Sequence, residues 1–298
     1  MNAVLEAAGL GKRYHRRWAL SDCTLAIPEG KVVGLVGPNG AGKTTLLQLA
    51  VGLLAPSAGT IQVLGGRPAD GPEQLGRVGF VAQDTPTYAA FSVADHLRLG
   101  EWLNPRWDKN LAAERIERLG LDPRQRAGSL SGGQRAQLAL TLAVAKRPQL
   151  LILDEPVASL DPLARSEFLG SLTEVVIENG VSVVLSSHLV ADLERVCDYL
   201  IILVASRVQV AGEIEKLLAS HHFVTGGDFD ESKLPPAVQV IETGGSGDHR
   251  RVLIRSDGPV HDSPLSVRPV NLEDLVLAYM GRAAHGEDRH SPLPDVRP

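Results

Sequence analysis

A glycine-rich loop between an apolar strand and a helix most constrains how this chain can fold. Residues Lys31–Val36 (KVVGLV) form a continuous apolar run rich in β-branched side chains, which is typical of a strand buried on both faces of a parallel sheet. Residues Thr44–Leu54 have the pattern of a helix. The loop between them consists of Gly37, Pro38, Asn39, Gly40, Ala41, Gly42, Lys43 and Thr44. Strand, glycine loop and helix in this order predict an α/β fold with a phosphate-binding loop.

The residue types in this loop suit phosphate chemistry. Glycines let successive backbone N–H groups point at phosphate oxygens, and the positive end of the following helix adds to that field. Lys43 supplies a charge for the β- and γ-phosphates, and the Thr44 hydroxyl can bind Mg²⁺. A chance glycine-rich turn explains the glycines, but not a Gly-Lys-Thr ending after a buried strand. We therefore expect a nucleotide and Mg²⁺ at this loop.

Two carboxylates follow a second buried strand. The run Leu150–Leu153 (LLIL) leads directly into Asp154 and Glu155. Side chains at the carboxyl ends of parallel strands face the crevice in which ligands bind. Asp154 is therefore expected to hold Mg²⁺, and Glu155 to accept a proton from an attacking water. The alternative is that Asp154 and Glu155 only begin a solvated turn. This alternative is less favoured, because the metal at a phosphate loop also needs a carboxylate from a second segment.

Alternating strands and helices fill the middle of the chain. Val181–Leu185 is a third buried strand, and the helical patterns Ser131–Ala145 and Leu163–Glu178 precede the second and third strands. This order predicts βαβ units with a parallel sheet. Residues 1 to about 30 have the pattern of short strands and turns.

A segment of different character interrupts this alternation. Val93–Leu103 and Leu111–Leu119 are amphipathic, and they predict a small helical insertion beside the sheet. Trp102 and Trp107 either pack the core of this insertion or line a groove that receives a helix of a membrane partner.

The character of the sequence changes again after about Ala219. Strand-like Ala237–Ile241 and Arg251–Ile254 and a short amphipathic helix, Asn271–Tyr279, predict a small α+β extension. We expect a nucleotide-binding domain at 1–219 with the helical insertion at about 84–145, an accessory region at 220–281, and a charged, proline-rich, disordered tail at 282–298.

Composition limits the function classes. The net charge of −5 and pI near 6.0 supply no basic field for DNA or RNA, so we expect no nucleic-acid partner. No stretch reaches the roughly 18–20 apolar residues of a membrane span, so a membrane role would need another chain to supply that span. Cys23 and Cys197 are isolated and match no disulfide or metal pattern.

A further motif gives a family resemblance. Leu130-Ser131-Gly132-Gly133-Gln134 resembles the signature motif of ABC ATPases, and it precedes the Asp154-Glu155 strand as in that family. The resemblance covers residues 4 to about 219 and includes every family motif. It implies a P-loop NTPase fold with a mostly parallel, RecA-like sheet, an antiparallel β subdomain and a helical insertion subdomain. In the family, the signature of one subunit closes over ATP held by the phosphate loop of another.

The resemblance also implies roles for single residues. Gln83 resembles the glutamine that reaches Mg²⁺ and the attacking water, and His188 resembles the histidine that contacts the γ-phosphate. Tyr14 resembles the aromatic residue that stacks on adenine, although a half-buried strand tyrosine is an alternative. The implied catalytic residues are Glu155, His188 and Gln83, and the implied metal ligands are Thr44, Gln83 and Asp154. The implied ATP-binding residues are Tyr14, Gly37 to Thr44, Thr45, Ser131, Gly132, Gly133, Gln134 and Asp161, of which Asp161 contacts the partner subunit.

Three kinds of ABC protein carry such a cassette. Translation ATPases usually carry two cassettes in tandem, and chromosome-maintenance ATPases split the cassette with a long coiled coil. This chain has one phosphate loop, and the segment 84–129 is too short for such a coil. We therefore expect the ATP-hydrolysing subunit of a transporter, with ATP and Mg²⁺ as cofactors, rather than a soluble ABC ATPase of translation or chromosome maintenance.

The resemblance also implies partners and a location. An integral membrane permease on a separate chain and a second ATPase subunit, in a homodimer or heterodimer, are the expected partners. The expected location is the cytoplasmic face of the membrane, with attachment through the permease. The tail segment Asn271–Leu277 resembles a terminal helix of export-type ATPases, which favours export. The segment Val157–Leu160 departs from the family pattern of a polar residue and glycine, so we expect altered contacts between subunits there.

Overall fold

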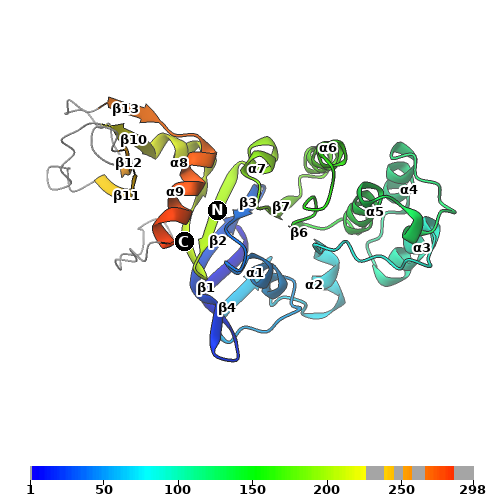
Figure 1. The fold of residues 1–298 in the computed structure, drawn as a ribbon. Helices are drawn as coiled ribbons and strands as arrows, with labels where there is room; N and C mark the ends of the chain where they lie inside the picture. The colour runs from blue at the N-terminus through cyan, green and yellow to red at the C-terminus, as the bar shows by residue number, and fades with distance from the viewer. Residues whose placement is uncertain (1, 226–237, 245–250, 257–265, 285–298) are drawn as a thin grey trace.

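The computed structural model describes residues 2–225, 238–244, 251–256 and 266–284, and these residues form three sheets and the helices that cover them (Figure 1). The central sheet has six strands. In spatial order they are β5 (Val78–Val81), β6 (Leu150–Asp154), β7 (Ser182–Ser186), β3 (Val32–Val36), β8 (Tyr199–Val204) and β9 (Arg207–Glu213).

Five strands of the central sheet are parallel, and β9 at its edge is antiparallel to β8. Every residue of β3, β6 and β7 is buried, which accounts for their continuous apolar sequences. The predicted mostly parallel sheet is confirmed, and each predicted buried strand lies within a residue of its observed bounds.

The two faces of this sheet belong to two different cores. Alternate residues such as Leu151 and Leu153 pack on one face, against helices that include α6 (Pro162–Asn179) and α7 (Val190–Val196). Their neighbours Leu150 and Ile152 pack on the other face, against α1 (Lys43–Ala50) and the N-terminal sheet. This is the alternation expected of a strand covered on both sides.

The N-terminal sheet is antiparallel, with order β2-β1-β4. Strands β1 (Ala3–Tyr14) and β2 (Arg17–Pro28) have 12 residues each, and β4 (Ala58–Val63) completes the sheet. The prediction of short strands before residue 30 was therefore wrong. Several register shifts interrupt the pairing of β1 with β2, and such bulges break the alternating pattern by which a long strand is recognised.

A small cluster of helices packs beside β5 and β6. It contains α3 (Val93–Leu103), α4 (Lys109–Arg118), the short 3₁₀ helix η1 (Ala127–Ser129) and α5 (Gly132–Ala145), whereas α2 (Gly71–Arg77) leads into β5. The predicted bounds of α3 are confirmed. Ser92 and Asp95 form a capping box at its start, which satisfies backbone donors that a helix leaves free.

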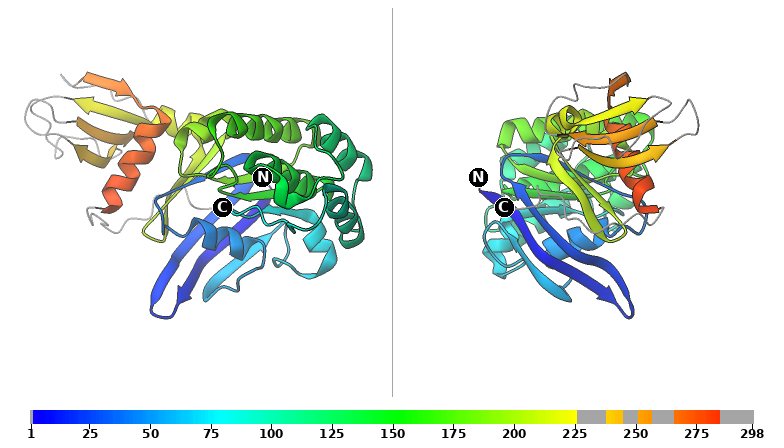
Figure 2. Two further views of the ribbon diagram at one scale, coloured as in Figure 1. Left: turned by 45° about the vertical axis from the view of Figure 1, so that its right-hand side comes forward. Right: turned by 90° about the vertical axis from the view of Figure 1, so that its left-hand side faces the viewer.

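The described residues of the C-terminal part form a sheet with order β11-β12-β10-β13 and the helices α8 and α9 (Figure 2). Its elements are α8 (Ile214–Ser220), β10 (His221–Thr225), β11 (Val238–Gly244), β12 (Arg251–Ser256), β13 (Ser266–Pro269) and α9 (Leu272–Ala284). The boundary expected between residues 219 and 220 falls inside α8. Arg282–Ala284 belong to α9, which corrects the expectation of a tail starting at 282; residues 285–298 lie outside the described residues.

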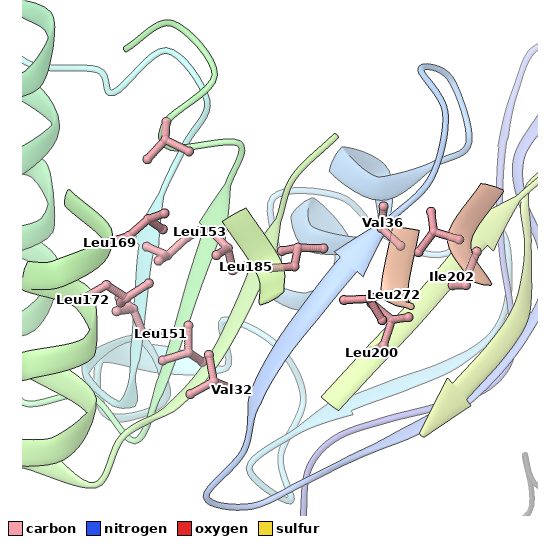
Figure 3. Packing of buried hydrophobic residues seen from close by; sticks show 14 of the residues in the cluster. Val32, Val36, Leu151, Leu153, Leu169, Leu172, Leu185, Leu200, Ile202 and Leu272 are labelled. Carbon is pink, nitrogen blue, oxygen red and sulfur yellow. The ribbon is translucent and has the colours of Figure 1, made fainter. Parts of the chain in front are cut away.

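Helix α9 packs against β8 and α7, so the C-terminal part shares a core with the central sheet. Leu272 lies beside Leu200 of β8 in Figure 3. Farther along α9, the Tyr279 hydroxyl lies 3.0 Å from Nε2 of the buried His221. Burial raises the pKa of Tyr279 to about 12, so its hydroxyl stays protonated at neutral pH.

None of the helices in the described ranges is long and apolar enough to span a bilayer.

Truncation of a core side chain on α9 should destabilise the whole chain. Leu275 is 0% exposed and belongs to the shared core, whereas Leu277 on the same helix is 56% exposed. We expect Leu275→Ala to lower the free energy of unfolding by about 2–5 kcal/mol, because it leaves a cavity in that core. Leu277→Ala should change it by less than about 0.5 kcal/mol. Urea unfolding of both variants measures the difference, and equal effects would contradict the shared core.

Candidate functional site

The phosphate loop connects β3 to α1, and two of its glycines have no room for a side chain. A Cβ at Gly37 would lie 2.0 Å from the Leu203 carbonyl oxygen. Gly42, the N-cap of α1, has φ +108°, and its Cβ would lie 2.3 Å from the Ala19 carbonyl oxygen. The loop is therefore pressed against the ends of β8 and β2, and only glycine fits at these positions.

Lys43 opens α1 and folds back over its own loop. Its ammonium donates to the Gly37 carbonyl at 2.8 Å and lies 3.3 Å from Glu155 Oε1. The structure describes the whole first turn of α1, and this turn contains no acidic residue. The partial positive charge at the start of the helix is therefore not neutralised by a carboxylate of that turn. The loop thus combines backbone N–H groups, a helix start and a buried lysine.

The Glu155 carboxylate contacts the side chains of Lys43 and His188. Its Oε1 is the atom near Lys43, and its Oε2 lies 3.0 Å from Nδ1 of His188. The Glu155 backbone has φ +44°, a left-handed conformation that non-glycine residues adopt rarely and at functional sites. This turn directs the carboxylate from the end of β6 toward the phosphate loop.

Ser186, which the sequence analysis did not select, connects the two carboxylate residues. Its hydroxyl donates to Asp154 Oδ1 at 2.8 Å and accepts a hydrogen bond from the Glu155 backbone N–H at 2.8 Å. Asp154 and Ser186 are paired in the parallel register of β6 and β7. The sequence signal was available: Ser186 ends a buried strand just before His188.

A pocket of about 690 Å³ lies over the phosphate loop. The predicted residues that line it are Tyr14, Asn39, Gly40, Ala41, Gly42, Lys43, Thr44, Thr45, Gln83, Glu155 and His188. The structure thus brings together residues from the N-terminal sheet, the phosphate loop, the end of β5 and the ends of β6 and β7. Gly37 and Pro38 shape the loop from outside the pocket, and Asp154 lies buried behind Glu155.

Four lining residues were missed by the sequence analysis: Arg17, Trp18, Ala19 and Ala158. Arg17 pairs with Tyr14 across the tight turn between β1 and β2, so the start of β2 meets the same pocket. An accurate hairpin prediction would have found it. Ala158 lies in the segment Val157–Leu160, which departs from the pattern of the resembling family.

The remaining predicted residues lie at two other helix starts. Ser131 caps α5: its hydroxyl accepts from the Gln134 backbone N–H at 3.2 Å, and Gln134 Oε1 accepts from the Ser131 N–H at 2.9 Å. Asp161 caps α6 by accepting from Leu163 and Ala164 at 3.0 Å. Ser131, Gly132, Gly133, Gln134 and Asp161 do not line the pocket over the phosphate loop of the same chain.

Comparison with known proteins gives the family. Residues 20–158 match the family model described as ABC transporter. The ABC transporter ATP-binding protein YxlF of Bacillus subtilis is 34% identical over 219 residues, which cover 72% of each chain. This chain belongs to the family of ABC transporter ATP-binding proteins. The family assignment makes it an ATPase subunit, and it confirms the resemblance drawn from the signature motif.

Further relatives of this ABC ATPase are transport proteins too. The Nod factor export ATP-binding protein I of Neorhizobium galegae is 34% identical and covers 90% of this chain and 82% of its own. The bacitracin transport ATP-binding protein BcrA of Enterococcus faecalis is 28% identical and covers 92% and 89%. These relatives do not favour the alternative of an ATPase of translation or chromosome maintenance.

Solved structures show the same fold. An ATP binding subunit of an ABC transporter superposes with a TM-score of 0.65 at 30% identity, over 72% of this chain and 92% of the other. The cbiO1 structure from Clostridium perfringens, described as part of the ABC transporter complex cbiONQ, has a TM-score of 0.63 at 27% identity, over 74% and 92%. The P-loop NTPase fold expected of this ABC ATPase is confirmed.

The close packing of the phosphate loop gives a test of its geometry. Gly40 and Gly42 both have positive φ, but a Cβ on Gly40 would meet nothing within 4 Å. We expect Gly40→Ala to cost about 1–3 kcal/mol of unfolding free energy, from backbone strain alone. Gly42→Ala should cost more, because its Cβ also overlaps the Ala19 carbonyl. Urea unfolding compares the two, and equal costs would contradict the packing of Gly42 against β2.

Proposed function

We propose that this ABC ATPase hydrolyses ATP at the Gly37–Thr44 loop with Glu155 as general base, and powers export through a separate membrane permease. The position of the Glu155 carboxylate carries the proposal: it lies 3.3 Å from the Lys43 ammonium and 3.0 Å from the His188 ring, at the wall of the pocket over the loop. A carboxylate so placed can accept a proton at the site where a γ-phosphate would bind.

Binding of ATP would replace contacts that the chain now makes with itself. The Lys43 ammonium is engaged by Glu155 and by the Gly37 carbonyl, and the β- and γ-phosphates would take it over, together with the loop N–H groups and Thr45. Tyr14 is partly exposed at the pocket wall, and it is the proposed stacking partner of adenine. Arg17 and Trp18 extend the same wall.

The proposed metal ligands suit Mg²⁺. Thr44 offers a hydroxyl, Gln83 an amide oxygen and Asp154 a carboxylate, and such hard oxygen donors are the ligands that Mg²⁺ prefers. The described residues contain no group of three or more acidic, His or Cys side chains that could hold a metal alone, which agrees with a Mg²⁺ bound jointly with substrate phosphates. When bound, it would neutralise charge on the β- and γ-phosphates.

The proposed reaction is attack of a water on the γ-phosphorus. Glu155 takes a proton from the water as the new P–O bond forms, and the bond from the γ-phosphorus to the bridging oxygen of ADP breaks. Gln83 would orient the water, and His188 would donate a hydrogen bond to the γ-phosphate. Ser186 holds the Asp154 carboxylate and the Glu155 backbone in place for both tasks.

The site is proposed to be completed by a second subunit. Ser131–Gln134 at the start of α5 lie outside the pocket over this chain's own phosphate loop. The Ser131 and Gln134 N–H groups are used within the helix cap, so the N–H groups of Gly132 and Gly133 are the ones proposed to bind an anion at this helix N-terminus. In a head-to-tail homodimer or heterodimer, they would contact ATP held by the other subunit, and Asp161 would lie at the same interface. ATP would then favour the closed dimer, and hydrolysis would reopen it.

The proposed permease would dock in a second groove, of about 550 Å³, and we call this the docking groove. Its apolar wall includes Leu53 and Leu75, which are 65% and 49% exposed, and such exposed apolar surface marks interaction sites. Ala82 lines the docking groove and the next residue, Gln83, lines the nucleotide pocket. This adjacency would couple the nucleotide to the permease at the cytoplasmic face of the membrane.

The direction of transport rests on the relatives. Proteins named for Nod factor export and bacitracin transport align over 90% and 92% of this chain, which extends the likeness beyond residue 219.

Trp102 is 79% exposed and Trp107 packs beside Gly100, and neither lines the docking groove. The exposure of Trp102 contradicts the alternative that this side chain packs in the core of the helical insertion.

The net charge of −5 continues to favour a role without nucleic acid.

Replacement of the proposed base tests the mechanism. Glu155→Gln should lower kcat by about 10²- to 10⁴-fold while ATP binding stays equal or becomes tighter, because Lys43 loses a competing carboxylate. Lys43→Ala is the matched control, and it should weaken ATP binding by roughly 10- to 100-fold. Steady-state phosphate release and fluorescent-nucleotide titration measure the two. Wild-type turnover in Glu155→Gln would exclude this residue as the base.

A site shared between two subunits predicts concentration dependence. The ATPase rate per subunit should rise with protein concentration over the range in which light scattering detects dimers, because Ser131–Gln134 of one subunit complete the site of the other. Glu155→Gln should accumulate as a dimer with ATP. A rate per subunit that is constant from monomeric to dimeric concentrations would show that each chain hydrolyses ATP alone.

A further inference from the structure

The docking groove contains one lysine that takes no part in the proposed hydrolysis of ATP. Of the described residues that line this groove, only Lys146 is charged. It caps the C-terminal end of α5, one turn after Leu142, which also lines the groove. Burial lowers the pKa of Lys146 below its ordinary value, because a cation beside apolar walls loses part of its hydration. The groove therefore holds a partly desolvated positive charge.

Lys146 differs from the other described lysines in having no partner. Within the described ranges, its ammonium makes neither a hydrogen bond nor an ion pair, whereas each other lysine there makes one. Those lysines are Lys12, Lys31, Lys43, Lys109 and Lys216.

The two amide side chains of the groove are already engaged. Gln74 donates to the Val63 carbonyl at 2.6 Å, and Asn104 donates to the Gly100 carbonyl at 2.8 Å. Each amide N–H group is therefore already bonded to a backbone carbonyl of this chain. Lys146 is the polar side chain of the described groove whose donors make no hydrogen bond to the described residues.

Docking would make this unpaired charge costly. A helix that filled the docking groove with apolar side chains would remove the remaining water from the Lys146 ammonium. Burial of an unpaired charge is unfavourable, and an opposite charge with good geometry offsets that cost. An entirely apolar partner is therefore disfavoured, and a cationic one is excluded more strongly by repulsion.

We propose that the permease segment occupying the docking groove is an amphipathic helix carrying an aspartate or glutamate that pairs with Lys146. The inference rests on the proposed docking of a permease in this groove, and it adds the chemistry of the partner. Leu53 and Leu75 at the exposed wall would contact the apolar face of that helix. The ion pair would select among permeases, since a helix without the carboxylate would leave Lys146 buried and unpaired.

The experiment begins with the wild-type chain in membranes of cells that produce it. A carbodiimide, which joins an amine to a carboxylate without a spacer, is applied to these membranes and the products are analysed by mass spectrometry. The expected product joins Lys146 to an aspartate or glutamate in a cytoplasmic segment of a permease. This step needs no variant, so it does not depend on how a variant folds.

Binding of the co-purified permease, in detergent micelles, is then measured for variants of known thermal stability. Lys146→Met should bind roughly 30-fold more weakly or worse, whereas Lys146→Arg, which keeps the charge, should bind more tightly than Lys146→Met. Lys146→Glu should be the weakest, and reversal of the cross-linked acidic residue to lysine should restore its binding. Leu75→Gln is the matched groove variant, and it tests docking without changing charge.

The outcomes separate the two proposals. If Leu75→Gln weakens permease binding while Lys146→Met binds like wild type and no Lys146 cross-link forms, docking stands and the carboxylate inference is overturned. If neither variant changes the affinity of the co-purified permease, the docking groove itself is wrong. If no permease co-purifies with the wild-type chain, the proposed function fails and the inference falls with it.

Discussion

The parallel register of three buried strands is the constraint on which the site depends. Pairing of β6 with β7 places Asp154 beside Ser186, and pairing of β7 with β3 places Ser186 beside Leu35, two residues before the phosphate loop. Segments more than a hundred residues apart thereby end at one edge of the sheet. Because side chains alternate between faces, a slip of one residue would exchange the two cores and move the carboxylates away from Lys43.

Much of the fold could be predicted because its signals are local. Continuous apolar runs identified the buried strands, and periodic apolar residues identified α3 with its observed bounds. The long hairpin of β1 and β2 was missed because bulges break its alternation. The end of α9 was missed because tertiary packing extends it: Gly281 lies so close to Glu242 of β11 that a Cβ there would meet its carboxylate at 2.3 Å.

The candidate site could be predicted where its functional residues are consecutive in the sequence. The phosphate loop and the Asp154-Glu155 pair could be recognised from motifs, since loop and metal chemistry require fixed residue types at fixed spacing. Arg17 and Ser186 have no such motif, because hairpin and parallel pairing bring them to the site. The Ser-x-x-Gln spacing of Ser131 and Gln134 is the pattern of a capping box, and the structure contains that cap. No local pattern indicates that Lys146 is the unpaired charge in a groove.

The packing of α9 on β8 also constrains how this chain can change over evolutionary time. Leu272, Leu275 and Tyr279 complete the core that Leu200 and Leu193 begin, so the region after residue 219 cannot be exchanged between relatives as a free module. A replacement must bring a helix whose apolar face fits β8 and α7, and substitutions on one side select for substitutions on the other. The C-terminal region is therefore expected to diverge in step with the ATPase surface it covers.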